Sequence, residues 1–302
     1  MTPPLKAAAI AAFVGLAGLA VPALAQDAGY PAPAPAPAPA PATGYDDGER
    51  APFSGVYIGA AGGYDAQPND PGSSILFDRN LDGRFGDTVT TAAGANAFSP
   101  GFCNGRARGA TPLPTGCRND KDAAAYYGRV GLDHQMGAIV VGVVGEFGKS
   151  EIDDSVSAYS TTPASYTLRR SIDWEGSARG RLGFAADTTL FYGTAGVGYA
   201  RIDRDFITTN TANAFTGRGK RNQFGLTAGG GIEQKISRHV SIGLEYMFHQ
   251  YRDDDYRVRA TAGSAPATNP FILAPNTTGT DFRRSDTDFR WHSMRGTVAF
   301  RF

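Results

Sequence analysis

Residues 240–249 read VSIGLEYMFH, and the alternation in this stretch decides the fold. Successive side chains of a β-strand point to opposite faces of the sheet, so a period of two predicts one face of each kind. The apolar face here would carry Val240, Ile242, Leu244, Tyr246 and Phe248. The opposite face would carry Ser241, Gly243, Glu245 and His249.

Seven further segments have the length and composition of strands. Six of them alternate in the same way, whereas residues 190–202 are apolar or small on both faces, so the orientation of that strand is not predicted. Each of the seven segments has roughly the 9–11 residues that a tilted membrane strand needs. The seven segments are 55–65, 126–135, 138–148, 174–184, 190–202, 224–234 and 292–302.

The connections between these segments alternate in length. Three are turns of a few residues, at Met136-Gly137, Ala186-Asp187 and Ser237-Arg238, and four are long, at 66–122, 151–172, 205–221 and 253–288. This pattern predicts an all-β fold, an eight-stranded antiparallel transmembrane β-barrel with long extracellular loops and short periplasmic turns. The alternative is a soluble β-sandwich, in which the apolar faces would point inward.

The N-terminal residues predict export. A basic start, an apolar run and the sequence Ala23-Leu24-Ala25 are typical of a cleaved signal peptide over residues 1–25, with a retained membrane anchor as the alternative. Residues 26–52 contain a Pro-Ala repeat, which favours an extended periplasmic linker. The barrel would then occupy residues 53–302, in the outer membrane of a Gram-negative bacterium.

The polar faces predict a lumen lined by ion pairs. An eight-stranded barrel is only wide enough for side chains to fill it, and buried charges persist when they are paired. This argues against a general diffusion porin but leaves open a small gated channel. We expect Arg301 and Glu233, near the periplasmic ends, to be solvated and unpaired. The predicted lumen residues are Arg129, Asp133, Glu146, Glu175, Arg179, Arg181, Glu233, Glu245, Arg295 and Arg301.

Two local motifs lie in the first long connection. Cys103 and Cys117 are the only cysteines, and in an oxidising compartment they are expected to form a disulfide bond, with free thiols as the alternative. Asp78, Asn80 and Asp82, followed by Gly83, resemble the first half of a calcium loop, and Asp87 could supply a further ligand. Val89 stands where an EF-hand has glutamate, so a polar turn is the alternative.

No catalytic residue is predicted. Some small barrels modify lipid A with a serine and a histidine, but His292 and Ser293 are adjacent and should face opposite sides of their strand. The chain has 29 basic and 29 acidic residues, so no affinity for nucleic acid is expected from its charge. We expect no cofactor apart from the calcium ion considered above.

The segments FSGVYIGAAGGY, LFYGTAGVGYARI and MRGTVAFRF resemble the small outer-membrane proteins of alphaproteobacteria, of the OmpA-like transmembrane and opacity-protein type. The resemblance implies roles in envelope integrity and surface contact. It also implies contact with outer-membrane lipid, lipopolysaccharide and the barrel-assembly machinery, which would read an assembly signal at Val298, Phe300 and Phe302. Peptidoglycan and surface ligands are further candidate partners, and Phe53 stands where many members have tryptophan.

Overall fold

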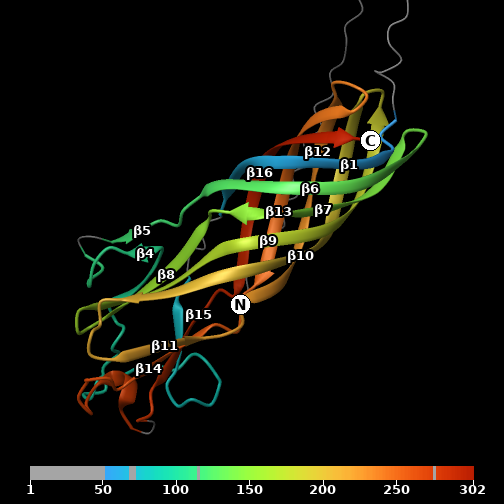
Figure 1. Cartoon of the computed structure of the whole chain (residues 1–302). Coiled ribbons are helices and arrows are strands. Elements are labelled where there is room, and N and C mark those ends of the chain that lie inside the picture. Colours follow the sequence, from blue (N-terminus) through green and yellow to red (C-terminus); the bar gives the residue numbers. More distant parts are fainter. Residues whose placement is uncertain (1–51, 68–72, 114–115, 275–276) are drawn as a thin grey trace, which may run out of the picture. The chain divides into compact units, whose positions relative to one another are not determined.

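The computed structural model describes residues 52–67, 73–113, 116–274 and 277–302 (Figure 1). The predicted signal peptide and all of the predicted linker except Pro52 lie outside the described residues. No helix within these ranges is long and apolar enough to span a membrane.

Eight strands of the described part of the chain close into an antiparallel barrel. Each pairs with two neighbours, and the ring is closed where β16 pairs with β1, with Ile58 opposite Phe300. The predicted eight-stranded antiparallel barrel is therefore confirmed. The strands are β1 (Gly55–Ala66), β6 (Ala123–Met136), β7 (Ile139–Ser150), β9 (Ala164–Ala186), β10 (Thr189–Thr208), β12 (Asn222–Lys235), β13 (Val240–Arg252) and β16 (Asp288–Arg301).

The three short turns lie together at one end of the barrel. Between β6 and β7 the chain reverses over two residues, and Gly137 has a φ of 62°, which glycine adopts without the steric cost of a side chain. Asp187, between β9 and β10, has a φ of 54°. Aspartate is one of the few other residue types that tolerate this left-handed region, so the sequence suits both turns.

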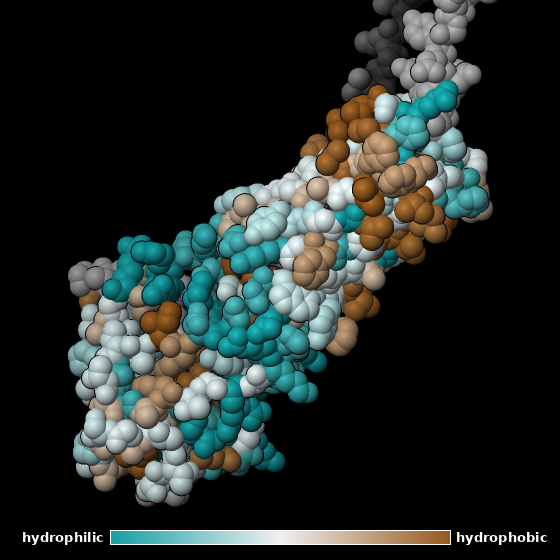
Figure 2. Space-filling view, in the orientation of Figure 1, coloured by the Kyte–Doolittle hydropathy of each residue, from teal (hydrophilic) through white to brown (hydrophobic). Residues whose placement is uncertain are grey.

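The apolar faces of the strands point outward, as a membrane barrel requires and a soluble sandwich does not. Figure 2 shows hydrophobic side chains gathered on the wall formed by the barrel strands. The strand whose orientation was open has Phe191 and Val197 outside and Leu190 and Tyr192 inside. Other exposed wall residues include Val56, Ile58, Val130, Leu132, Val143, Leu182, Leu226, Leu244, Met294 and Val298.

Four aromatic rings form a continuous row around the outer wall, at the end away from the short turns. Trp174 lies between Phe147 and Tyr199, with both ring centroids 5.7 Å away, and Tyr199 lies 4.7 Å from Phe224. The row crosses β7, β9, β10 and β12. Aromatic girdles of this kind mark the membrane interfaces of barrels, so the row marks the outer boundary of the membrane segment.

The long connections contain strands rather than only the loops that the sequence predicted. β9 and β10 continue beyond the aromatic row, where their pairing skips Asp173, a bulge that redirects the strands as they leave the barrel. β8 (Asp153–Ser160) pairs with this extension of β9 and with β3 (Gly101–Asn104). The remaining elements are β2 (Ile75–Asp78), β4 (Arg106–Ala107), β5 (Cys117–Arg118), β11 (Ala214–Arg218), β14 (Arg257–Thr261), β15 (Thr280–Arg284) and the 3-10 helix η2 (Pro270–Ile272).

The extracellular strands have a core of their own. Strands β11, β14, β15 and β2 form a second sheet, and side chains from all the long connections pack together beneath it. Phe77 and Phe98 lie 4.4 Å apart between ring centroids, and Tyr166 and Phe271 lie 5.6 Å apart. A buried aromatic core holds this region in a folded arrangement.

Candidate functional site: the lumen and the outer mouth

The structure brings all ten predicted lumen residues to the barrel interior. In the middle of the lumen, the guanidinium group of Arg129 lies 2.7 Å from the carboxylates of both Glu146 and Glu245. Arg179 contacts the same two carboxylates at 2.6 and 3.4 Å, and Arg295 lies 3.2 Å from Glu146. Two carboxylates thus form ion pairs with three guanidinium groups. Each of these side chains comes from a strand residue that points into the lumen.

Glu146 of β7 pairs with Arg129 and Arg179 on its two neighbouring strands, but the other three pairs cross the lumen. Arg129 is on β6 and Glu245 on β13, and two strands, β1 and β16, separate them around the ring. Arg179 of β9 is separated from Glu245 in the same way by β10 and β12. The paired side chains therefore occupy the lumen itself, where an open channel would hold water.

A second cluster lies toward the short turns. Asp133 contacts Arg181 at 2.8 Å and Arg301 at 2.9 Å, and Glu233 contacts both arginines, at 3.5 Å in the case of Arg301. The expectation that Arg301 and Glu233 are solvated and unpaired is wrong. The reason is Phe53, which is fully buried across this end of the barrel together with Leu190 and excludes the solvent.

The third cluster, toward the outer mouth, adds Asp65, His249 and Ser293 to the predicted lumen residues Glu175 and Arg295. Glu175 lies 3.1 Å from Nδ1 of His249, and Arg295 contacts both His249 and the hydroxyl of Ser293, the latter at 2.8 Å. That hydroxyl donates to Asp65 of β1. Val56, Ile58 and Tyr64 occupy alternate, outward positions of residues 55–65, so the same alternation would have predicted that Asp65 faces inward.

Above these clusters an apolar layer closes the barrel. Trp291 stacks on His249 with a centroid distance of 4.8 Å and on Tyr251 at 5.5 Å. Ile152, Ile172, Ala200, Ile202 and Phe289 complete this layer, and all are buried.

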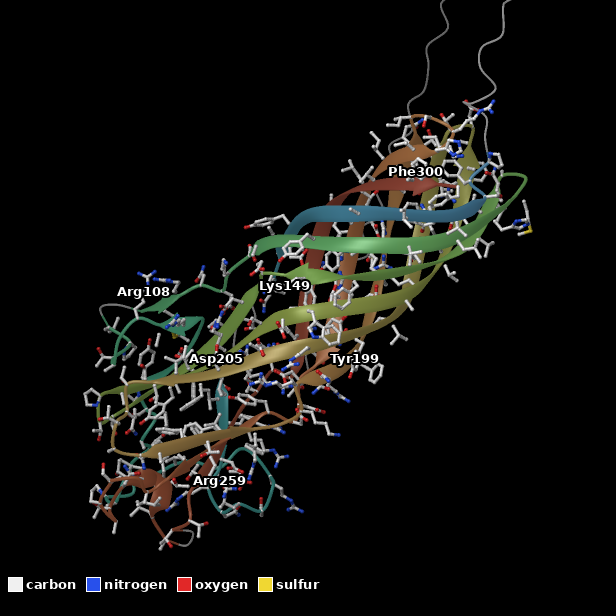
Figure 3. The ribbon with its side chains drawn as sticks, in the orientation of Figure 1. Arg108, Lys149, Tyr199, Asp205, Arg259 and Phe300 are labelled. Atoms are coloured by element: carbon white, nitrogen blue, oxygen red, sulfur yellow. A yellow bond between two sulfur atoms is a disulfide. The ribbon has the colours of Figure 1, made fainter. Side chains whose placement is uncertain are left out.

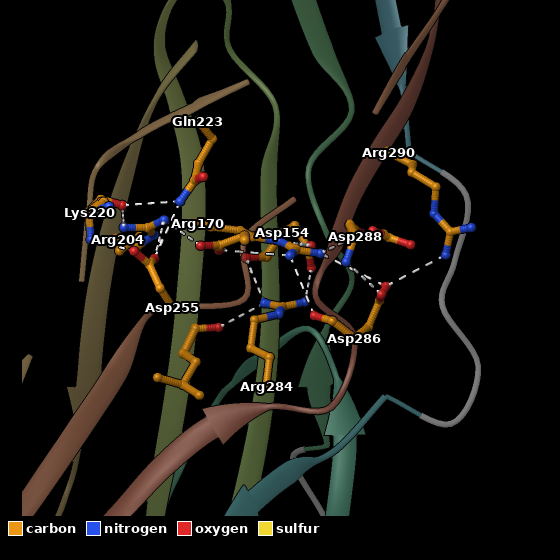
Figure 4. A network of polar contacts seen from close by, with 12 residues as sticks. Asp154, Arg170, Arg204, Lys220, Gln223, Asp255, Arg284, Asp286, Asp288 and Arg290 are labelled. Atoms are coloured by element: carbon orange, nitrogen blue, oxygen red, sulfur yellow. Dashed lines mark hydrogen bonds and ion pairs between the residues drawn. The ribbon is translucent and has the colours of Figure 1, made fainter. Parts of the chain in front are cut away.

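A polar network covers the outer mouth (Figure 4). Arg170 is fully buried, and its Nε donates to Asp154 at 2.6 Å while Arg284 donates to the other Asp154 oxygen at 2.6 Å. Arg204 lies 2.5 Å from Asp253. Burial alone would raise the pKa of Asp154, but the guanidinium groups of Arg170 and Arg284 lower it to about 2. The carboxylate therefore stays charged at any physiological pH.

The predicted calcium residues lie in a tight turn after β2. The carboxylate of Asp78 accepts hydrogen bonds from the backbone N–H groups of Asp82 and Gly83, and Asp87 accepts from Arg79 at 2.8 Å. Asn80 donates its side-chain amide to Asp82 at 3.2 Å. Within the described ranges, no three His, Cys, Asp or Glu side chains are arranged to hold a metal ion. Calcium binding stays a prediction.

The remaining predicted residues are placed as follows. Cys103 and Cys117 form the expected disulfide bond, with their Cα atoms 6.3 Å apart. The ring of His292 faces outward and shares a 2.6 Å hydrogen bond with Tyr246, while Ser293 is buried in the lumen. Val298, Phe300 and Phe302 are all exposed on the outer wall.

No protein-family model matches this chain. A 22 kDa outer membrane protein of Rhizobium leguminosarum bv. viciae is 31% identical over 140 residues, which cover 46% of this chain and 58% of the relative. A 31 kDa outer-membrane immunogenic protein of Brucella melitensis biotype 1 is 28% identical over 133 residues, 43% of this chain and 55% of the relative. The chain thus spans little more than half the length of these relatives.

Among solved structures, the outer membrane protein OprG from Pseudomonas aeruginosa is similar with a TM-score of 0.46 and 14% identity. The superposition covers 85% of this chain and 98% of OprG. Similarity of this degree says nothing about function.

Proposed function

Because this chain is a small outer-membrane β-barrel protein, related to outer-membrane proteins of alphaproteobacteria, we propose that it acts as a structural barrel. Its barrel holds a folded β-structure at the cell surface, where it contributes to envelope integrity and to contacts through the extracellular segments. Outer-membrane lipid and lipopolysaccharide surround the wall. We assign it no catalytic role.

The cross-lumen ion pairs carry this proposal. Arg129, Arg179 and Arg295 share two buried carboxylates, and apolar layers built around Phe53 and Trp291 lie on either side of the polar clusters. A barrel filled in this way suits a rigid anchor, because buried, mutually paired charges resist rearrangement.

The test compares a strain that lacks this protein with strains that carry tagged versions. The full chain should restore detergent resistance and surface attachment. A bulky tag at Gly263, in an exposed extracellular turn, should reduce attachment and leave detergent resistance intact. The same tag at Ser237, in a short turn, is the control and should affect neither. A deletion strain that retains full resistance and attachment would overturn the proposal.

A small gated channel is the second candidate. The observation in its favour is that Arg129 and Arg179 each contact both Glu146 and Glu245, so either guanidinium group would keep one partner if it released the other to open a narrow path. Planar-bilayer recordings of the purified protein separate the two. A structural barrel gives no steady conductance, whereas steady nanosiemens-scale openings would favour the channel.

Two further partners are proposed, one for the final barrel strand and one for the segments outside the membrane. We propose that the barrel-assembly machinery recognises the final strand, and that peptidoglycan or a surface ligand is a partner of the segments outside the membrane.

A lipid-modifying activity is the least favoured alternative. Mass spectrometry of lipid A from cells that express the chain checks it, because the loss of an acyl chain would reveal an enzyme.

A further inference from the structure

A hairpin in the first long connection carries an unusual charge pattern. We call strands β4 (Arg106–Ala107) and β5 (Cys117–Arg118), together with Gly105 and Arg108, the arginine hairpin. It includes Arg106, Arg108 and Arg118, and the sequence from Gly101 to Arg118 contains neither aspartate nor glutamate. The segment therefore has a charge of +3 with no internal compensation.

The fold places these charges side by side. Arg106 and Arg118 are directly opposite each other in the β4–β5 pairing, a position at which like charges are destabilising. Together with Ala107 and Arg108, they line an open hollow of about 560 Å³. Figure 3 shows Arg108 at the margin of the molecule, pointing away from the ribbon.

None of the three guanidinium groups has a carboxylate partner among the described residues. Elsewhere the chain pairs exposed arginines with acids, as in Arg201 with Asp173 at 3.4 Å and Arg221 with Asp203 at 3.2 Å. Asp120, the acid nearest to the hairpin in sequence, accepts from the backbone of Ser155. Arg84, Arg257 and Arg283 also lack a carboxylate partner, but Arg257 and Arg283 stack on Phe85, a ring contact that none of the three hairpin arginines makes among the described residues.

The hairpin is held firmly in spite of this repulsion. The backbone N–H of Gly105 donates to Ser155 at 2.8 Å, and the hydroxyl of Ser157 both donates to the Gly105 carbonyl and accepts from Ala107. Gly105 has a φ of 105°, and a Cβ there would overlap the carbonyl oxygen of Arg118. The disulfide between Cys103 and Cys117 closes the hairpin.

Exposed, adjacent guanidinium groups without acidic partners, carried on a backbone that is held in place, suit the binding of anions. The planar guanidinium fork matches phosphate and carboxylate oxygens, and local conflicts of this kind in an otherwise consistent structure occur at functional sites. We infer that the arginine hairpin binds the clustered phosphate groups on the sugars of lipopolysaccharide in the surrounding membrane.

The position of the hairpin favours this ligand. It is attached to β8 at Ser155, eight residues along the chain from Phe147 in the aromatic row. β9 runs from Gly176, opposite Phe147, to Arg169, opposite Ser155, and at about 3.3 Å per residue this places Ser155 about 20 Å along the strand beyond the aromatic row. That level lies in the sugar layer above the outer leaflet. The inference rests on the proposed function, because it assumes that this region projects from the outer face.

The test measures binding of purified, phosphorylated lipopolysaccharide to the folded, full-length mature protein in detergent. Replacing Arg106, Arg108 and Arg118 with glutamine should weaken the apparent Kd at least about tenfold and flatten its salt dependence. Wild-type protein should lose affinity to the same extent for lipopolysaccharide whose phosphates have been removed.

The matched control removes three exposed arginines that have acidic partners, in the variant Arg201→Gln/Arg221→Gln/Arg252→Gln. It has the same net charge as the hairpin variant and should bind within about twofold of the wild type. Equal loss in the control would overturn the inference, because net charge alone would then explain binding. Unchanged binding by the hairpin variant would also overturn it.

A soluble polyphosphate, inositol hexakisphosphate, tests whether the hairpin binds lipopolysaccharide or a free anion. If inositol hexakisphosphate binding depends on the hairpin while lipopolysaccharide binding does not, the assigned ligand is wrong. Heat-modifiability gels confirm that each variant folds. Detergent resistance and attachment of whole cells are separate readouts, so a failure of lipopolysaccharide binding can be told apart from a failure of the proposed barrel function.

Discussion

Arg129 of β6 and Glu245 of β13 form a buried ion pair of 2.7 Å across the barrel lumen. The same glutamate also contacts Arg179 at 3.4 Å. Removing a single carboxylate therefore leaves two guanidinium groups less well compensated in an interior that water does not reach. Because an uncompensated buried charge is costly, this carboxylate should matter more to stability than any exposed acid.

We expect Glu245→Gln to lower the free energy of unfolding by about 3 kcal/mol, the usual effect of breaking a buried pair. The measurement is the denaturant midpoint of the folded band on a heat-modifiability gel. The control is Glu151→Gln, which removes the exposed pair with Lys149 and should cost less than about 1 kcal/mol. Equal effects of the two substitutions would mean that the lumen pairs add no stability.

The barrel itself could be predicted from period-two alternation, because its wall has lipid on one side and a polar lumen on the other. The alternation fails for β8, where residues on both faces are buried, Val156 against the aromatic core and Ser157 against the arginine hairpin. It fails also for the short strand β11, whose five residues give too little pattern to read.

Ion-pair partners could not be predicted in the same way. Alternation predicts that Arg301 and Glu233 point inward, but their pairing depends on Phe53, which closes the barrel from a separate segment. His249 was assigned to the polar face, yet its partner Glu175 lies on β9, which is not a neighbour of β13. Contacts across a lumen leave no periodic signal along the chain.

Calcium removal should have little effect on the turn after β2. The Asp78 carboxylate is already satisfied by two backbone N–H groups, so we expect EDTA and calcium to give equal protease cleavage within residues 78–87. Asp78→Ala should speed cleavage about fivefold in either buffer, because it removes about 1 kcal/mol of hydrogen bonding. Protection that depends on calcium would instead support the calcium site predicted from the sequence.

Asp120 should make the extracellular region less stable as pH rises. Burial, followed by the nearby charge of Asp154, raises the pKa of Asp120 from 3.8 to about 7. Between these two pH values the folded state binds more protons than the unfolded state, so the free energy of unfolding falls as pH rises and levels off above about 7.

The substitution Asp120→Asn should remove this dependence and slow hydrogen exchange at residues 153–157 at pH 8, after correction for the intrinsic rate. The side-chain amide oxygen of this variant could still accept the hydrogen bond from the backbone N–H of Ser155. The control Asp122→Asn, at an exposed side chain bonded to the backbone of Gln67, should leave the pH dependence in place. Identical exchange profiles for the wild type and Asp120→Asn would contradict the expectation.

Phe302 should matter for assembly more than for stability. Its backbone N–H donates to Val56 at 3.0 Å, but its ring is 69% exposed and contacts only the outer wall, 5.2 Å from Phe300. Phe302→Ala should therefore reduce the amount of protein in the outer membrane several-fold, while barrels that do assemble keep an unfolding midpoint within about 1 kcal/mol of the wild type. The control is Phe224→Ala, equally exposed at 71% but in the aromatic row at the other end of the wall, which should leave the amount unchanged. Equal outer-membrane levels for both variants would show that the final aromatic residue carries no assembly signal.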